Sequence, residues 1–146
     1  MPDPKITLDP KPDPALRDAI LTPLIAYNFS KVGERPLSTF ALFIRDPASD
    51  AILGGLWARS FFDWTFVELL FVPEAMRGSG LGQSLLAQAE AIAVERGCIG
   101  IYLDTFSFQA RGFYEKQGYG LFGMLENYPD DEKRFFLSKR LTRQGP

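Results

Sequence analysis

A run of glycines between two apolar segments is the part of this sequence best suited to bind a ligand. The run is Arg77-Gly78-Ser79-Gly80-Leu81-Gly82, and it follows the β-forming segment 66–72. The apolar residues that come next recur at helical spacing: Leu81, Leu85, Leu86, Ala89, Ile92 and Ala93. A strand, a glycine loop and a helix start bring backbone N–H groups and the positive end of a helix dipole to one point. Because glycine lets a ligand approach the backbone closely, the loop is predicted to bind phosphate or pyrophosphate.

Known phosphate-binding patterns narrow the choice of ligand. A dinucleotide-binding G-x-G-x-x-G loop requires glycine where this chain has Gln83, and a P-loop requires Lys-Ser/Thr where it has Gln83-Ser84. What remains, Arg77-x-x-Gly80-x-Gly82, resembles the acetyl-CoA signature (Q/R)-x-x-G-x-(G/A) of the GNAT N-acetyltransferases. The alternative is a glycine turn before a helix, with Arg77 as a solvated loop residue.

The resemblance implies a cofactor site in this loop. Its pyrophosphate would accept hydrogen bonds from the backbone N–H groups of Gly78, Ser79, Gly80, Leu81 and Gly82. Arg77 would add positive charge. The backbone N–H of a residue near Phe71 and Val72 would polarise the acetyl carbonyl.

A second signature follows, with one expected helix and one expected strand between the two. The segment 110–119, Ala-Arg-Gly-Phe-Tyr-Glu-Lys-Gln-Gly-Tyr, resembles the GNAT pattern A-x-x-F-Y-x-K-x-G-(F/Y) at every defined position. The family often has Asn three residues before this alanine, where the present chain has Ser107. Ser107 can cap a helix but reaches less far than Asn toward the pantetheine arm. With its helices and strands included, the resemblance covers about residues 40–140.

Acetyl transfer to an amine requires three kinds of help. The amine must lose a proton, a donor must stabilise the charge that develops on the carbonyl, and the departing thiolate needs a proton. The resemblance assigns the last role to Tyr114, whose phenol is protonated at neutral pH. The alternative is a helix tyrosine that packs its ring in the core.

Glu68 is the candidate base, drawing the amine proton through water as in similar GNAT members. It is the polar residue of an otherwise apolar segment, 66–72, and such a segment predicts a strand buried on both faces. An ionised carboxylate there is costly unless it is hydrated or partnered. The alternative is a structural glutamate, paired with an arginine.

Composition excludes several classes of protein. The chain has 146 residues, 46% apolar and 23% charged, which predicts a single domain, 1–146. A net charge of −2 without a basic block argues against nucleic acid as a partner. The absence of histidine and the single cysteine, Cys98, exclude a His-ligated metal, a Cys₄ zinc site and an intramolecular disulfide, so we expect no metal. No apolar run suits a signal peptide or a membrane span, which predicts a cytoplasmic protein with no membrane partner.

Pattern and resemblance together predict the fold class. Strands are expected at 40–45, 51–61, 66–72, 99–105, 119–125 and 135–137, with helices at 80–96 and 109–116. The strand at 99–105 should lie parallel to 66–72 through a right-handed crossover. The GNAT resemblance implies an α/β fold with a central mixed, mostly antiparallel, twisted sheet of six to seven strands. About four helices should flank the sheet, and a splayed parallel strand pair should hold the cofactor.

The expected activity is transfer of an acetyl group from acetyl-CoA, the co-substrate, to a primary amine by direct attack. The acceptor is either a small-molecule amine or a protein amine, and a homodimer is compatible with the pattern. Two alternatives remain open: a non-catalytic acyl-CoA-binding regulatory module, and a protein-lysine or N-terminal acetyltransferase.

Overall fold

The computed structural model describes residues 2–141, which divide into two compact units, one ending at Arg35 and the other beginning at Pro36. The first unit contains the 3₁₀-helix η1, Pro14–Arg17, and the helix α1, Asp18–Val32. Asp13 caps η1, since its side chain accepts a hydrogen bond from the Ala15 N–H at 2.9 Å. Residues 1 and 142–146 of the expected domain lie outside the described residues.

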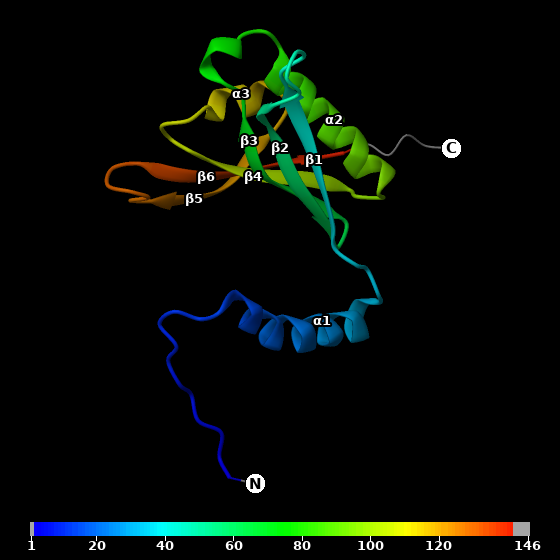
Figure 1. Cartoon of the computed structure of the whole chain (residues 1–146), viewed down its shortest axis with the longest axis vertical. Coiled ribbons are helices and arrows are strands. Elements are labelled where there is room, and N and C mark those ends of the chain that lie inside the picture. Colours follow the sequence, from blue (N-terminus) through cyan, green and yellow to red (C-terminus); the bar gives the residue numbers. More distant parts are fainter. Residues whose placement is uncertain (1, 142–146) are drawn as a thin grey trace. The chain divides into compact units, whose positions relative to one another are not determined.

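The second unit is built on a six-stranded sheet in the order β1-β2-β3-β4-β6-β5 (Figure 1). The strands are β1 Ser38–Arg45, β2 Ile52–Phe61, β3 Trp64–Phe71, β4 Gly100–Phe106, β5 Gly120–Glu126 and β6 Lys133–Arg140. β3 and β4 pair in parallel, and every other neighbouring pair is antiparallel. The prediction of a mixed, mostly antiparallel sheet with one parallel pair is confirmed.

Two helices of this unit position the predicted site. β3 leads through the 3₁₀-helix η2, Glu74–Met76, into α2, Leu81–Glu95, and α3, Arg111–Lys116, follows β4. α2 lies across β2, β3 and β4 (Figure 1). The side chains that α2 buries are Leu85, Leu86, Ala89 and Ala93. The described residues therefore contain three α-helices, where about four were expected.

The hydrophobic core lies between these helices and one face of the sheet. Ile101 and Leu103 of β4 and Leu137 of β6 are fully buried beside Leu86 of α2. Burial alternates along β4, as a strand with one core-facing side requires. Tyr114 of α3 belongs to the same cluster. The helix that follows the glycine loop and the helix of the second signature thus pack on one core.

Among residues 2–141, no helix is long and apolar enough to cross a bilayer. Within the same range, no three side chains of histidine, cysteine, aspartate or glutamate converge in a way that could hold a metal ion.

Candidate active site

The parallel strands β3 and β4 pair only along their first halves. The pairing begins at Trp64 with Gly100 and ends at Val67 with Leu103. Both strands continue beyond that point, to Phe71 and to Phe106. The predicted splayed parallel pair is therefore present, and a gap opens between the C-terminal ends of the two strands.

Glu68 occupies the point at which the gap opens. In the pairing of β3 with β2, Val67 lies opposite Ala58 and Leu69 lies opposite Trp57, so Glu68 is the extra residue of a β-bulge. A bulge bends a strand and redirects its side chains. The Glu68 side chain is exposed.

The prediction that both faces of this strand are buried is wrong for its second half. Leu69 is 63% exposed and Phe71 is 56% exposed. Both residues lie on the face of the sheet away from the core: Leu69 pairs with Trp57, which is 43% exposed, whereas Leu70 pairs with the buried Leu56 and packs against the core. Glu68 is exposed to solvent, so its charge carries no large desolvation cost.

The glycine loop has the conformation that its sequence predicts. Gly78 and Gly80 have φ values of +80° and +86°, a region that residues with a Cβ rarely adopt. A Cβ at either position would meet no atom within 4 Å, so backbone conformation, not space, calls for glycine. Gly80 is the N-cap of α2 and no side chain caps that helix end. The first N–H groups of α2 therefore lack intrahelical partners.

Two other residues of the loop make contacts within the protein. The Arg77 Nε–H donates a hydrogen bond to the carbonyl of Val72 at 3.0 Å, so this side chain folds back onto the exit of β3. A Cβ at Gly82 would lie 3.0 Å from the ring of Phe113, so Gly82 permits close packing of α2 on α3. Neither contact was foreseen from the sequence.

Tyr114 lies in the core, with its ring edge-on to Phe113 and Tyr119 at centroid distances of 5.2 and 6.3 Å. Burial raises the pKa of the Tyr114 phenol above its usual value, and the Asp104 carboxylate raises this pKa further. The phenol therefore keeps its proton at neutral pH, as a proton donor must.

Asp104 and Arg134 form an ion pair that sequence reasoning did not find. Asp104 belongs to the part of β4 beyond its pairing with β3, and its Oδ2 lies 2.8 Å from Nη2 of Arg134 in β6. The guanidinium also lies over the rings of Phe106, Tyr128 and Phe136, at 5.7, 5.3 and 5.1 Å. Arg134 lies outside both sequence signatures. The register of β4 with β6 brings it near Asp104.

Ser107 does not cap α3, although a serine at this position could do so. Its hydroxyl donates a hydrogen bond to the Glu132 carboxylate and accepts one from the Lys133 N–H at 2.8 Å. The N-cap of α3 is Ala110, which makes no side-chain capping bond. Ser107 therefore joins the end of β4 to the start of β6, because these two strands are neighbours in the sheet.

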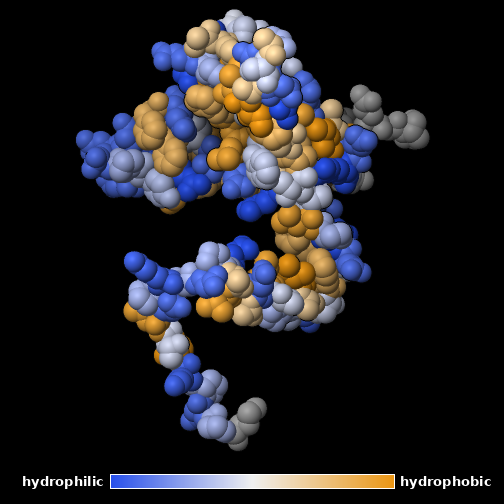
Figure 2. Space-filling model, in the orientation of Figure 1, coloured by the Kyte–Doolittle hydropathy of each residue, from blue (hydrophilic) through white to orange (hydrophobic). Residues whose placement is uncertain are grey.

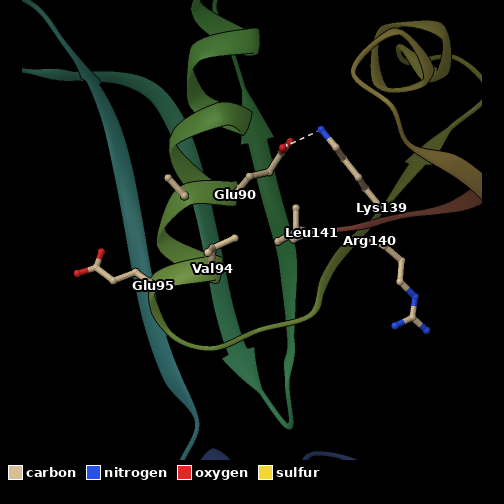
Figure 3. Close-up of a pocket in the computed structure, with 7 residues that line it drawn as sticks. Glu90, Val94, Glu95, Lys139, Arg140 and Leu141 are labelled. Carbon is tan, nitrogen blue, oxygen red and sulfur yellow. Dashed lines mark hydrogen bonds and ion pairs between the residues drawn. The ribbon is translucent and has the colours of Figure 1, made fainter. Parts of the chain in front are cut away.

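A cavity of about 530 Å³ lies at the other end of α2, between that helix and the end of β6 (Figure 3). Its lining includes Glu90 and Lys139, whose Oε1 and Nζ are 2.8 Å apart. The Tyr119 hydroxyl donates to the other Glu90 oxygen at 3.0 Å. This network joins α2, the segment between α3 and β5, and β6. None of the residues predicted to bind the cofactor lines the cavity.

Comparison with known proteins shows the family. Residues 8–119 match the model of the acetyltransferase (GNAT) family. The chain is 39% identical over 128 residues to the acetyltransferase Atu2258 of Agrobacterium fabrum, covering 88% of this chain and 93% of the relative. It is 37% identical over 136 residues to blasticidin-S acetyltransferase of Streptomyces morookaense, covering 92% and 94%.

Solved structures of acetyltransferases have a similar fold. The crystal structure of a proposed acetyltransferase from Agrobacterium tumefaciens superimposes with a TM-score of 0.87 at 37% identity, over 94% of this chain and 99% of that chain. A Bacillus anthracis structure in complex with acetyl coenzyme A matches with a TM-score of 0.58 at 26% identity, over 64% and 59%.

The chain belongs to the GNAT acetyltransferase family. It is an N-acetyltransferase that transfers an acetyl group from acetyl-CoA to an amine.

Proposed function

We propose that the chain acetylates a small-molecule primary amine at the gap between β3 and β4. The observation that carries this proposal is the parting of the two strands after Val67 and Leu103, directly before the glycine loop and the uncapped start of α2. An open strand edge and a helix N-terminus supply backbone donors for a carbonyl and for a phosphate. The family match at residues 8–119 extends over both compact units, which supports one acyltransferase domain at 1–146.

The chemistry of the residues fits acetyl-CoA as the co-substrate, which supplies an activated thioester. The N–H groups of residues 78–82 hold the pyrophosphate. A backbone N–H at Phe71 or Val72 stabilises negative charge on the acetyl carbonyl, because preorganised donors aimed at a developing oxyanion lower the barrier. The predicted contact of Ser107 with the cofactor is less well supported, because its hydroxyl already bonds Glu132 and Lys133.

Two side chains move protons in this proposal. Glu68, exposed at the bulge, accepts the proton of the attacking amine through water. Tyr114, which burial and Asp104 keep protonated, gives a proton to the leaving thiolate.

The acceptor is tested with a panel of small amines and acetyl-CoA, reading release of the free thiol. Blasticidin S belongs in the panel because a 37% identical relative is named for its acetylation. Turnover of a small amine supports the proposal. Turnover of a lysine-bearing protein with none of a small amine would instead indicate a protein acetyltransferase, and calorimetric binding of acetyl-CoA without any turnover would indicate a regulatory module.

A further inference from the structure

Three aromatic rings stack on one another where β4 ends. The ring centroids of Phe106 and Phe108 are 5.3 Å apart, with an angle of 10° between the two planes. Those of Phe106 and Tyr128 are 5.4 Å apart, with an angle of 32°. Tyr128 comes from the loop that joins β5 to β6. We call Phe106, Phe108 and Tyr128 the aromatic platform.

Two rings of the platform are open to solvent. Phe108 is 60% exposed and Tyr128 is 40% exposed. Single exposed apolar side chains are normal on a protein surface, whereas a group of them often marks a place where a ligand or partner binds. Sites for small molecules are lined mainly by apolar and aromatic side chains, with a few polar groups that fix orientation.

Hydrogen bonds hold the turn that carries Phe108. The side-chain carbonyl of Gln109 accepts hydrogen bonds from the Phe106 N–H at 2.7 Å and from the Thr105 hydroxyl at 3.1 Å. The Gln109 N–H donates to the Phe106 carbonyl at 2.8 Å. Because Thr105 is buried, this turn is bonded to the core side of β4.

Arg134 holds the other side of the platform. Its Nη1 donates a hydrogen bond to the Tyr128 hydroxyl at 3.1 Å, and its Nη2 is paired with Asp104. The guanidinium already lies over the rings of Phe106 and Tyr128, which disfavours a second cation there. The platform therefore suits an uncharged ring, and rings held in place in advance lose less freedom when a ligand binds.

The platform shares a face of the sheet with Glu68, the proposed base. β3 and β4 part after Val67 and Leu103, so Glu68 and Asp104 are the first residues beyond the last pair on the two strands. Asp104 and Phe106 alternate with buried neighbours along β4, so both lie on the face away from the core. The exposed Glu68 follows the buried Val67 and lies on that face also. A ring on the platform is therefore on the same side of the sheet as the proposed base.

We propose that the aromatic platform stacks a planar ring of the acceptor, so that the preferred acceptor is a primary amine joined by a short chain to an uncharged aromatic or heteroaromatic ring. This inference rests on the proposed function and names the class of its substrate. Phe108 and Tyr128 orient the ring, and the short chain carries the amine toward Glu68.

A matched pair of amines isolates the contribution of the ring. Phenylethylamine and cyclohexylethylamine have the same carbon skeleton, and only the first has a flat aromatic ring. The saturated ring is no less apolar, so the hydrophobic effect alone predicts no preference for the aromatic one. With acetyl-CoA and the wild-type protein, kcat/KM should be about threefold to tenfold higher for phenylethylamine, as expected for an aromatic pair.

Phe108→Leu should remove this preference. The variant keeps an apolar side chain and loses the ring, so the ratio of kcat/KM for the two amines should fall severalfold. Phe122→Leu is the matched control, because Phe122 is also 60% exposed but lies on β5, outside the platform. The control should keep the wild-type ratio.

Two variants of Tyr128 separate its ring from its hydroxyl. Tyr128→Phe loses the hydrogen bond from Arg134 and keeps the ring, so it should retain the preference for phenylethylamine. Tyr128→Leu loses both and should lose the preference. Equal losses in the two variants would overturn the stacking role of Tyr128, because the hydroxyl would then be what matters.

Equal kcat/KM for the two amines in the wild type would overturn the inference, as would a preference that survives in both Phe108→Leu and Tyr128→Leu. Calorimetry should show that these variants bind acetyl-CoA as the wild type does, since the platform contacts only the acceptor. If the wild type acetylated no small amine at all, the proposed function would fail. Turnover of small amines without any preference for a ring would leave that function intact, so the two failures are distinguishable.

Discussion

The two halves of β3 are both mostly apolar, but their neighbours in the sheet differ. The first half, Trp64–Val67, pairs with β2 on one side and β4 on the other, and Thr65 and Val67 are 0% and 3% exposed. In the second half, Leu69 and Phe71 are more than half exposed, although both are as apolar as Val67. Figure 2 shows apolar residues, in orange, on the surface of the unit formed by residues 36–141. The face of the sheet, and not the residue type, separates Val67 from Leu69: Val67 pairs with the buried Ala58, whereas Leu69, after the bulge, pairs with Trp57, which is 43% exposed.

The difference teaches how a strand can be both a structural element and a binding edge. Where β4 is present, backbone groups on that edge of β3 are used in the sheet and are closed to ligands. Where β4 has turned away, the same groups are left for a bound molecule. The bulge at Glu68 lies at the boundary between the two halves. The residue proposed as the base therefore follows directly on the last β3 residue that pairs with β4.

Matched leucine substitutions give the largest test of this comparison. Leu103 of β4 pairs with Val67 in the closed half and is 1% exposed, whereas Leu69 in the open half is 63% exposed. Leu103→Ala should lower the free energy of unfolding by about 2 to 5 kcal/mol, since it leaves a cavity in the core. Leu69→Ala should change it by less than about 0.5 kcal/mol.

Chemical denaturation of both variants measures these effects. Similar losses of stability in the two variants would contradict the division, because Leu69 would then contribute to folding as a core residue does.

The next largest effect is expected for Tyr114→Phe. The variant keeps the ring in the core and removes only the hydroxyl, so kcat should fall at least tenfold while CoA binding survives. A raised pKa favours the protonated phenol, so the acid is available up to the usual tyrosine pKa near 10 and above it. An alkaline fall in kcat centred below pH 9 would therefore arise from another group, and near-normal turnover in Tyr114→Phe would reject the assignment.

Most of the fold was predictable because local patterns specify it. The bounds of the helices and strands were predicted to within a few residues from the apolar segments and the glycines that end them. The parallel pairing of β3 with β4 followed from the order strand, loop, helix, strand and the crossover rule.

The candidate site was less predictable because it depends on where strands stop pairing. Nothing in the apolar run 66–72 distinguishes the flanked Val67 from the exposed Leu69. The pairing of Asp104 with Arg134 and of Ser107 with Glu132 and Lys133 depends on the register of β4 with β6. The stacking of Phe106 on Tyr128 likewise joins residues from two separate segments of the chain, so no motif records it.

The smallest expected effect is that of Glu68→Gln, and it sharpens the comparison at its boundary. The substitution keeps the size of an exposed side chain at the bulge, so stability should be unchanged to within about 0.5 kcal/mol. At neutral pH kcat should fall by about tenfold or less, below the usual contribution of a general base, because solvent also reaches the amine at this open position. The pH–rate profile is the sharper measurement: a carboxylate base gains a proton as the pH falls and stops working, and glutamine cannot titrate. The acidic limb of the profile should therefore flatten in Glu68→Gln. If that limb instead keeps its midpoint and slope, Glu68 is only a residue of the bulge, and the proton of the amine leaves by another route through the open half of β3.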